Sequence, residues 1–242
     1  NPSKSNFQNF GLQSIDRHDE PAVMLAETML EEVYCSKFLG IYLNRGLTWN
    51  DHIDHVCSKL ASGIYVLRSL AKYCPSQVLM TAYYGLIYPH LTYRLVLWGA
   101  CANNQFIRVF KLQKQAIRII AQLKFRESCK ETFKKLQLLT LPCLYILETT
   151  LFCMSKCAMT NGRDIHDYET RGRENYRAGR HRTVVYERLP SQAGVHFVNK
   201  LPDSIKYAPT PKALKTRLKR FLVSQTFYNV NEFLAYHWET TN

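Results

Sequence analysis

The sequence predicts an α+β protein that is mainly α, with a short N-terminal antiparallel β hairpin region followed by a helical bundle and a basic C-terminal helix. The first 48 residues contain short runs in which apolar and polar residues alternate, a period typical of half-buried strands. From Trp49 onward, apolar residues recur every three or four positions, as on one face of a helix. Hydrophobic residues make up 46% of the 242 residues, which is enough apolar surface for a folded core and excludes an intrinsically disordered chain.

The N-terminal strands are expected at 22–27, 29–34 and 38–43, and the turn signal Asn44-Arg45-Gly46 ends the third run. Gly40 lies inside that run, where a glycine permits another backbone to approach closely or marks a bulge or a packing position. A helix starting near residue 21 and reaching residue 33 is an open alternative, because apolar residues also recur there at helical spacing.

Helices are expected where a helical apolar pattern follows a residue that favours a helix start. Asn50 can cap the first helix, and Pro75 can occupy the first turn of the second. Pro89 interrupts the pattern, and a further helical stretch reaches Trp98. Residues 161–182 hold few aliphatic residues and many arginines, so we expect an irregular, mobile loop. The expected helices are 50–73, 76–88, 106–123, 142–159, 211–222 and a last turn at 231–237.

The net charge of +13 is unevenly distributed along the chain. Residues 1–60 contain five Lys/Arg and eight Asp/Glu, whereas residues 61–242 contain 27 and 11. The segment 108–135 carries nine bases and two acids, and the segment 206–220 carries six bases and no acid. Such a surplus favours a polyanionic partner, either nucleic acid or a membrane surface, although basic runs are also common on solvated helix faces.

The eight cysteines lie within apolar stretches, and no signal peptide precedes them, so reduced, buried thiols are expected rather than disulfides. No C-x-x-C pair occurs, and no zinc spacing is present. The most apolar window, 138–159, contains Pro142, Glu148 and Lys156 and is typical of a buried helix rather than a membrane span. These features indicate an intracellular protein, in the nucleus or cytoplasm, that is not secreted. Because the chain begins at Asn1 without a methionine, we expect it to be a piece of a longer protein.

Catalytic motifs are sparse. Two-metal phosphoryl transfer needs clustered carboxylates, and no adjacent Asp-Asp pair occurs anywhere in the sequence. Asp51 and His55 lie at i and i+4 and could form a metal ligand pair, but an acid in a first helical turn also complements the helix dipole. His90 follows Pro89 in an apolar context and is expected to be a packed core residue. The residues alone therefore indicate a basic, mostly helical nucleic-acid-binding domain.

Several short motifs follow one another in order along nearly the whole chain. They are NPSKSNF (1–7), FLGIYL (38–43), LTWNDHI (47–53), AYYGLIYPHLTY (82–93), WG (98–99), LQKQAIR (112–118), HDYETR (166–171) and NKLPDSI (199–205). In this order and spacing they resemble the C-terminal part of the reverse transcriptases of non-LTR (LINE-type, jockey-like) retrotransposons. The family has Thr where this chain has Ser5, and usually has Gly where this chain has Arg94.

The resemblance implies three regions: the end of the polymerase palm and a primer-grip hairpin (1–48), a helical thumb-like domain (49–160), and an Arg-rich loop with a basic C-terminal region (161–242). It implies that Lys4 faces the incoming nucleotide, that residues 34–43 form the hairpin that grips the primer end, and that the primer grip consists of Phe38, Leu39, Gly40 and Ile41. The family's catalytic Ala-Asp-Asp strand would lie upstream of Asn1, so this chain would have no catalytic or metal-binding residues. It would need no cofactor, while Mg²⁺ is expected in the full-length polymerase.

The implied function is that of a fragment of an RNA-directed DNA polymerase, inactive alone, that holds a template–primer duplex. The implied partners are the RNA template, the DNA primer and the upstream polymerase domain, and no membrane. A thumb holds the backbone of a duplex through basic side chains. The expected phosphate contacts are Lys111, Lys114, Arg118, Lys215, Arg217 and Lys219. The alternative is a non-enzymatic nucleic-acid-binding module derived from a transposon remnant.

Overall fold

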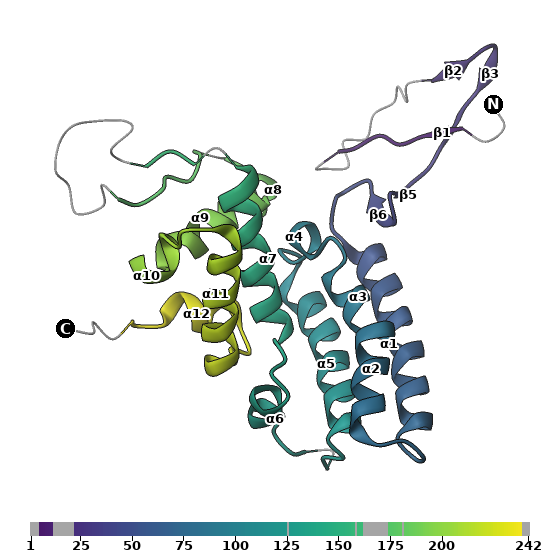
Figure 1. The fold of residues 1–242 in the computed structure, drawn as a ribbon. Coiled ribbons are helices and arrows are strands. Elements are labelled where there is room, and N and C mark those ends of the chain that lie inside the picture. Colours follow the sequence, from purple (N-terminus) through teal and green to yellow (C-terminus); the bar gives the residue numbers. More distant parts are fainter. Residues whose placement is uncertain are drawn as a thin grey trace.

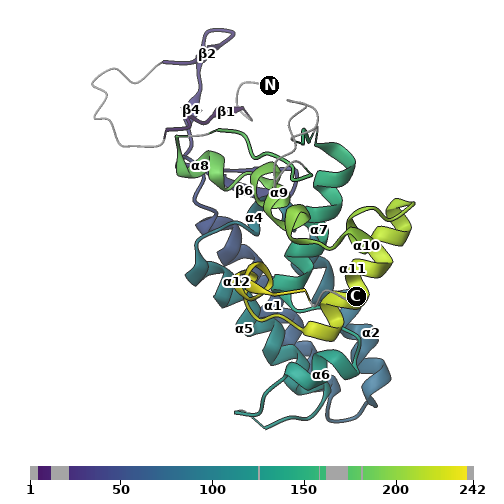
Figure 2. The ribbon, with the colours of Figure 1, turned by 90° about the vertical axis from the view of Figure 1, so that its left-hand side faces the viewer.

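The computed structural model describes residues 5–11, 22–124, 126–157, 159–161, 174–180 and 182–238, and its secondary structure is mainly helical. Short strand pairs lie near the N-terminus and a body of helices follows them (Figures 1 and 2). This arrangement confirms the expected α+β, mainly α class.

The first strands form an arm that projects from the helical body in both views (Figures 1 and 2). β2 (Met24–Leu25) pairs antiparallel with β3 (Thr28–Met29), and β1 (Asn6–Phe7) pairs parallel with β4 (Glu31–Glu32). The alternative of a helix over 21–33 is therefore wrong. The strands are shorter than expected, and Met24 and Met29 are 63% and 68% exposed, so no core face extends the pairing.

The next pair is a tight hairpin of β5 (Cys35–Phe38) and β6 (Ile41–Asn44), in which Phe38 pairs with Ile41. The hairpin that the resemblance implies at 34–43 is therefore present, whereas the single strand-like run expected at 38–43 is wrong, because the chain reverses within it. Leu39 and Gly40 have φ angles of 46° and 79°, and two successive positive φ values form a two-residue hairpin turn. Gly40 therefore lies in a turn rather than in a strand.

The first helices follow the expected order with different ends: α1 (Asn50–Leu70), α2 (Ser76–Leu86), α3 (Tyr88–Thr92), α4 (Leu95–Trp98) and α5 (Asn103–Ile120). Pro89 lies in the first turn of α3, where its missing N–H costs no helical hydrogen bond. The stretch after Pro89 is broken again, because Arg94 takes a left-handed conformation before α4.

The expected cap on α1 is wrong. Trp49 occupies the cap position without a side-chain hydrogen bond to the helix, and the Asn50 carboxamide oxygen instead accepts a hydrogen bond from Gln105 Nε2 at 3.1 Å. Asn44, at the end of β6, makes the local connection. Its Nδ2 donates to Thr48 Oγ1 at 2.8 Å and to Asp51 Oδ2 at 2.6 Å, so one buried amide joins the hairpin to the first turn of α1.

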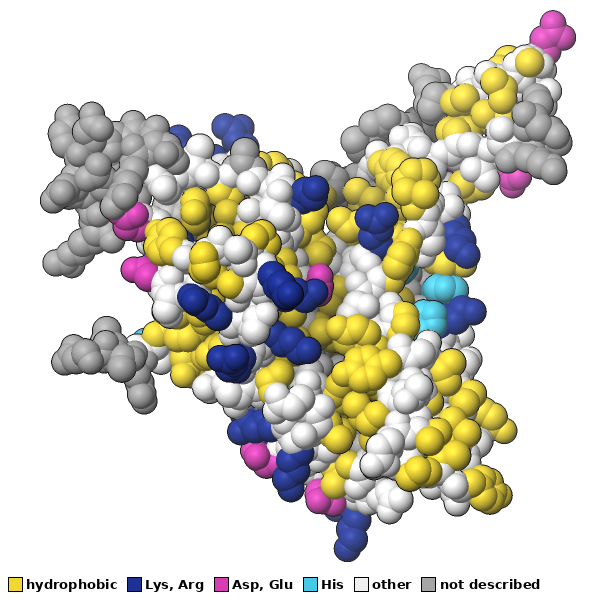
Figure 3. All heavy atoms as spheres, in the orientation of Figure 1, with side chains coloured by type: hydrophobic (Ala, Val, Ile, Leu, Met, Phe, Trp, Pro, Cys, Tyr) yellow, Lys and Arg dark blue, Asp and Glu magenta, His cyan; other side chains and the backbone are white. Residues whose placement is uncertain are grey.

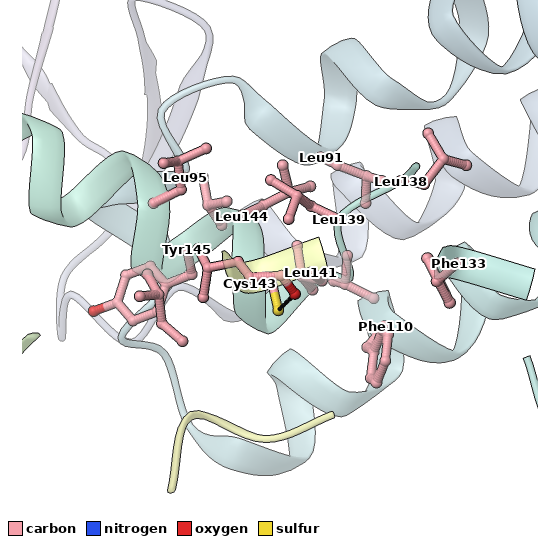
Figure 4. Close-up of a cluster of buried hydrophobic side chains, with 14 of the residues drawn as sticks. Leu91, Leu95, Phe110, Phe133, Leu138, Leu139, Leu141, Cys143, Leu144 and Tyr145 are labelled. Atoms are coloured by element: carbon pink, nitrogen blue, oxygen red, sulfur yellow. Dashed lines mark hydrogen bonds between the residues drawn. The ribbon is translucent and has the colours of Figure 1, made fainter. Parts of the chain in front are cut away.

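Helix α7 (Leu141–Lys156) is the centre of the body. It contacts α4, α5, α9, α11 and α12, and residues 141–147 are all buried. A short helix that the sequence did not predict, α6 (Lys130–Lys135), precedes it. Figure 4 shows side chains of α3, α4, α5, α6 and α7 meeting in one cluster, with Phe110 and Phe133 at one end and Tyr145 at the other.

The C-terminal part is α8 (Val184–Glu187), α9 (Pro190–Lys200), α10 (Asp203–Lys206), α11 (Pro211–Gln225) and α12 (Val230–Ala235). Helix α11 confirms the expected basic C-terminal helix, whereas α8, α9 and α10 were not predicted. Within the expected loop at 161–182, residues 174–180 contain an isolated bridge from Tyr176 to Asn161, and residues 162–173 and 181 lie outside the described residues. One hydrophobic core includes residues on both sides of position 160, such as Ile53 and Phe233.

A buried glutamine that no sequence pattern singled out connects this core. Gln113, in α5, is fully buried, and its Nε2 donates to Tyr83 Oη at 3.1 Å and to the Leu139 carbonyl at 2.9 Å. Its Oε1 accepts a hydrogen bond from the Leu141 N–H at 2.7 Å. Since every polar atom of the amide has a partner, Gln113 fixes α2, α5 and the start of α7 relative to one another.

Candidate nucleic-acid interface

The tip of the β5–β6 hairpin presents two apolar side chains to solvent. Phe38 and Leu39 are 63% and 64% exposed, whereas Ile41 is 7% exposed and packs toward the body. Of the four residues expected in the primer grip, Phe38, Leu39 and the backbone of Gly40 therefore lie at the surface. Ile41 can only support them.

The turn is held in place by Tyr93, which lies between α3 and α4. Tyr93 Oη donates a hydrogen bond to the Leu39 carbonyl at 2.7 Å. A β-carbon at Gly40 would lie 3.2 Å from the Tyr93 ring and hydroxyl, and the φ of 79° disfavours any other residue. The close approach expected at Gly40 is thus made by a side chain of the same chain.

Among the residues that the structure describes, helix α11 carries the strongest basic surface. Its Lys and Arg side chains are all exposed, and the helix contains no acid; they are Lys212, Lys215, Arg217, Lys219 and Arg220. Figure 3 shows such side chains gathered over α11 and continuing toward α6. A helix face with one sign of charge attracts polyanions without reading sequence.

Arg217 is oriented by the body as well as exposed. Its Nη1 donates to the Ser204 carbonyl at 2.5 Å, which brings α10 against α11. An open cavity of about 510 Å³ lies beside it, lined by Ser204, Ile205, Arg217, Arg220, Phe221 and Ser224. Arg220 was not among the predicted contact residues, although its position three residues after Arg217 placed both on one helix face.

The basic side chains of α5 differ in how freely they could contact a phosphate. Lys111 is exposed, but the Lys114 ammonium lies 4.7 Å from the Phe110 ring centroid and 5.3 Å from that of Tyr228. Burial, followed by the neighbouring Arg118 charge, lowers the pKa of Lys114. Arg118 Nη2 donates to the Glu127 carbonyl at 3.2 Å. Lys114 and Arg118 are thus partly used in packing α5 against the segments around it.

The structure does not bring all predicted contact residues together. The hairpin packs on α1 and on Tyr93, whereas α11, with Lys215, Arg217 and Lys219, packs on α6, α7 and α10 (Figure 1). Lys206, within the basic run, is buried beneath this surface, where its Nζ donates to the Glu174 carbonyl at 2.9 Å. Lys4 lies outside the described residues.

The possible metal pair is not assembled. Asp51 accepts the hydrogen bond from Asn44, and His55 packs its ring against Tyr42 at a centroid distance of 4.9 Å. Among the described residues, no group of three His, Cys, Asp or Glu side chains is placed to hold a metal ion. His90 is partly exposed, so the prediction that it is a core residue is wrong.

All eight cysteines are free thiols, four of them buried and four partly buried. Burial raises the pKa of Cys101 to about 12 and that of Cys143 to about 11. These two thiols stay protonated at neutral pH and are therefore poor nucleophiles. In the described part of the chain, no helix is long and apolar enough to cross a bilayer.

Comparison with known proteins supports a relationship to the reverse transcriptases of non-LTR retrotransposons. The chain is 28% identical over 124 residues to a protein described as a probable RNA-directed DNA polymerase from transposon X-element of Drosophila melanogaster. The match covers 50% of this chain and 13% of the length of that relative. No protein-family model matches the chain, and no solved structure matches it.

Proposed function

We propose that this chain is a segment of a retrotransposon RNA-directed DNA polymerase that holds the backbone of a template–primer duplex. In this proposal the arm and hairpin form the end of the palm and the primer grip, and α1 to α7 form a thumb-like domain. The following region, which contains α11, extends the nucleic-acid surface. The upstream polymerase domain, within the nucleus or cytoplasm, would contain the catalytic carboxylates and Mg²⁺.

The observation that carries the proposal is the exposed basic face of α11 on a chain related to polymerases. Five bases and no acid on a single helix favour phosphate contacts, which bind any sequence. The exposed apolar tip at Phe38 and Leu39 offers a second surface, suited to sugar and base faces at a duplex end. By the resemblance, Lys4 would face the nucleotide in the assembled palm.

Equilibrium binding to a short RNA–DNA duplex tests the proposal. Replacing Lys212, Lys215 and Lys219 by Gln should weaken binding at least tenfold, equally for duplexes of unrelated sequence. The matched control replaces three exposed bases elsewhere, Arg68, Lys72 and Lys156, by Gln and should change binding far less. Equal losses in the two variants would show that net charge alone, and not the α11 face, binds the duplex.

A primer-extension assay tests the enzymatic part. The sequence contains no adjacent Asp-Asp pair, so the chain alone should bind the primed template but add no nucleotide in the presence of Mg²⁺. Extension should appear when the chain is joined to the upstream domain of its parent protein. If the joined protein binds a duplex but never extends it, the alternative of a non-enzymatic binding module is correct.

A further inference from the structure

A cavity of about 340 Å³ lies at the junction of the hairpin, α1 and α3, away from the α11 surface. Its lining includes His52 and His55 from α1, His90 from α3, Tyr93 at the end of α3, and Lys37 and Gly40 from the hairpin. In Figure 3, histidine side chains reach the surface beside basic side chains along the α1 edge. None of the functions considered above uses these histidines.

His52, which lines this cavity, is a buried side chain whose ring nitrogens have no hydrogen-bond partner. Only 2% of the residue is exposed, and the atoms without a partner are Nδ1 and Nε2. The rings of Trp49 and Trp98 lie edge-on at centroid distances of 6.1 and 6.0 Å, and they offer no acceptor oxygen. A buried imidazole without a partner is costly, and a polar group in the cavity would remove that cost.

The charges around the cavity select the sign of such a group. Lys37 contributes a positive charge from β5, and Lys59 contributes another from α1; both lower the pKa of His55, after burial as the largest cause. Burial and Lys59 likewise lower the pKa of His90. No carboxylate is among the described residues that line the cavity, and the nearby Asp51 is bonded to Asn44. The site therefore favours an anion with several acceptor oxygens.

We propose that the cavity formed by His52, His55, His90 and Lys37 binds a phosphate group. A phosphate oxygen would accept a hydrogen bond from the buried His52 ring, Lys37 would supply a positive charge, and the more exposed His55 and His90 would donate further hydrogen bonds. The phosphate could come from the backbone of a nucleic acid that passes the hairpin or from a free phosphate compound. The site is separate from α11 and does not depend on the function proposed for that helix.

Nuclear magnetic resonance of the full chain, with ¹⁵N in its histidine rings, tests this site. Titration with inorganic phosphate, against sodium chloride of equal ionic strength, should shift the ring signals of His52, His55 and His90. It should also raise the pKa values of His55 and His90, because a bound anion favours the protonated ring. His196 and His237, which are exposed elsewhere, should shift little.

Two variants make the test specific. His52→Phe keeps an aromatic ring but no donor and should weaken phosphate binding about tenfold. Lys37→Gln, on an exposed hairpin position, should weaken it severalfold without touching the buried ring. His196→Phe is the control and should bind as the unaltered chain does.

Competition between an RNA–DNA duplex and inorganic phosphate distinguishes the two possible sources of the phosphate group. If an RNA–DNA duplex shifts the same three histidines and inorganic phosphate displaces it, the site holds a backbone phosphate. If inorganic phosphate saturates the site and the duplex does not compete, the ligand is a free phosphate compound. The inference is overturned if the three histidines do not respond to either probe, or if His196 responds to the same extent.

Discussion

Arg94 has a left-handed backbone conformation, which favours glycine over other residues. Its φ of 52° is in the left-handed region, which costs an ordinary L-residue about 1–2 kcal/mol. The family that the chain resembles usually has Gly here, and the observed φ supplies the physical reason. The Arg94 side chain is exposed, with its guanidinium carbon 5.8 Å from the Tyr93 ring centroid.

We therefore expect Arg94→Gly to stabilise the chain. The gain in the folded state, reduced by the larger entropy of glycine in the unfolded state, should be about 0.5–1 kcal/mol. Urea denaturation, followed by circular dichroism, measures this difference. Arg94→Ala retains a β-carbon and should give no gain; a gain of equal size with Ala would show that removal of the Arg side chain, and not the backbone conformation, is responsible.

His52 makes stability depend on pH. Burial, with a smaller contribution from His55, lowers the pKa of His52 to about 4, from about 6.5 in an unfolded chain. Protonation therefore favours the unfolded state: stability is complete above about pH 6.5 and falls by about 2–3 kcal/mol as the pH decreases toward 4. Denaturation midpoints in phosphate-free buffers across this range measure the loss.

The matched variant for this pH effect is His52→Phe. Because Phe cannot be protonated, most of the decrease between pH 6.5 and 4 should disappear. A smaller decrease should remain, because burial and the charges of Lys59 and Lys37 also lower the pKa of His55. An unchanged pH profile in the variant would locate the responsible group elsewhere.

At the scale of elements, the contact between α7 and α9 depends on a glycine. A β-carbon at Gly194 would lie 2.1 Å from Cys153 Sγ and 2.8 Å from its Cβ, so the helices would have to separate. We expect Gly194→Ala to destabilise the chain by about 1–3 kcal/mol, as overpacked cores do. Thermal unfolding followed by calorimetry or circular dichroism measures this loss.

Gly85, in α2, is the matched control for Gly194. A β-carbon there would meet no atom within 4 Å, so Gly85→Ala should stabilise the helix by up to about 1 kcal/mol through propensity alone. Opposite signs for these two substitutions would confirm that the α7–α9 contact, rather than helix propensity, determines the effect at Gly194. A stabilising Gly194→Ala would contradict the close packing of the two helices.

The elements that could be predicted are those whose sequence contains both a start signal and several turns of pattern. Pro75, Pro142 and Pro211 lie at or near the first residues of α2, α7 and α11, and these helices were predicted within a few residues. Helices α6, α8 and α10 have four to six residues, which is too short for a period to be recognised. Helix α9 had a usable signal in Pro190, followed by the apolar spacing of Val195 and Val198.

The resemblance located the hairpin at 34–43, but the position of its turn could not be predicted from the local sequence pattern. Its turn consists of Leu39 and Gly40, and a leucine with positive φ has no sequence signal comparable to Asn-Gly or Asp-Gly. The stronger turn signal at 44–46 begins at the last residue of β6 and correctly marks the end of that strand, but it gives no information about the reversal at 39–40. The Tyr93 hydrogen bond that holds the turn joins residues 54 positions apart, a contact that local sequence does not contain.

At the scale of the whole molecule, the charge asymmetry indicated where the candidate interface lies but not which bases are available. The run at 206–220 became the exposed face of α11, as its composition suggested. In the folded chain, however, Lys206 is buried, and Lys114 packs against two aromatic rings. Sequence gives the number of charges in a segment, whereas the fold decides which of them can meet a phosphate.

The salt dependence of duplex binding tests which basic side chains contact phosphates and which are used in packing. If about six phosphates are neutralised, log K should fall with log salt at a slope near −5. Replacing Lys212, Lys215 and Lys219 by Gln should make the slope shallower by about 3, because each lost contact releases about 0.9 fewer counterions. Lys111→Gln should remove about one contact, whereas Lys114→Gln should change the slope less and lower stability instead, since Lys114 packs on Phe110 and Tyr228. Titrations of one RNA–DNA duplex from low to high salt measure all the slopes, and an equal change for Lys114 and Lys111 would contradict the assignment of Lys114 to packing.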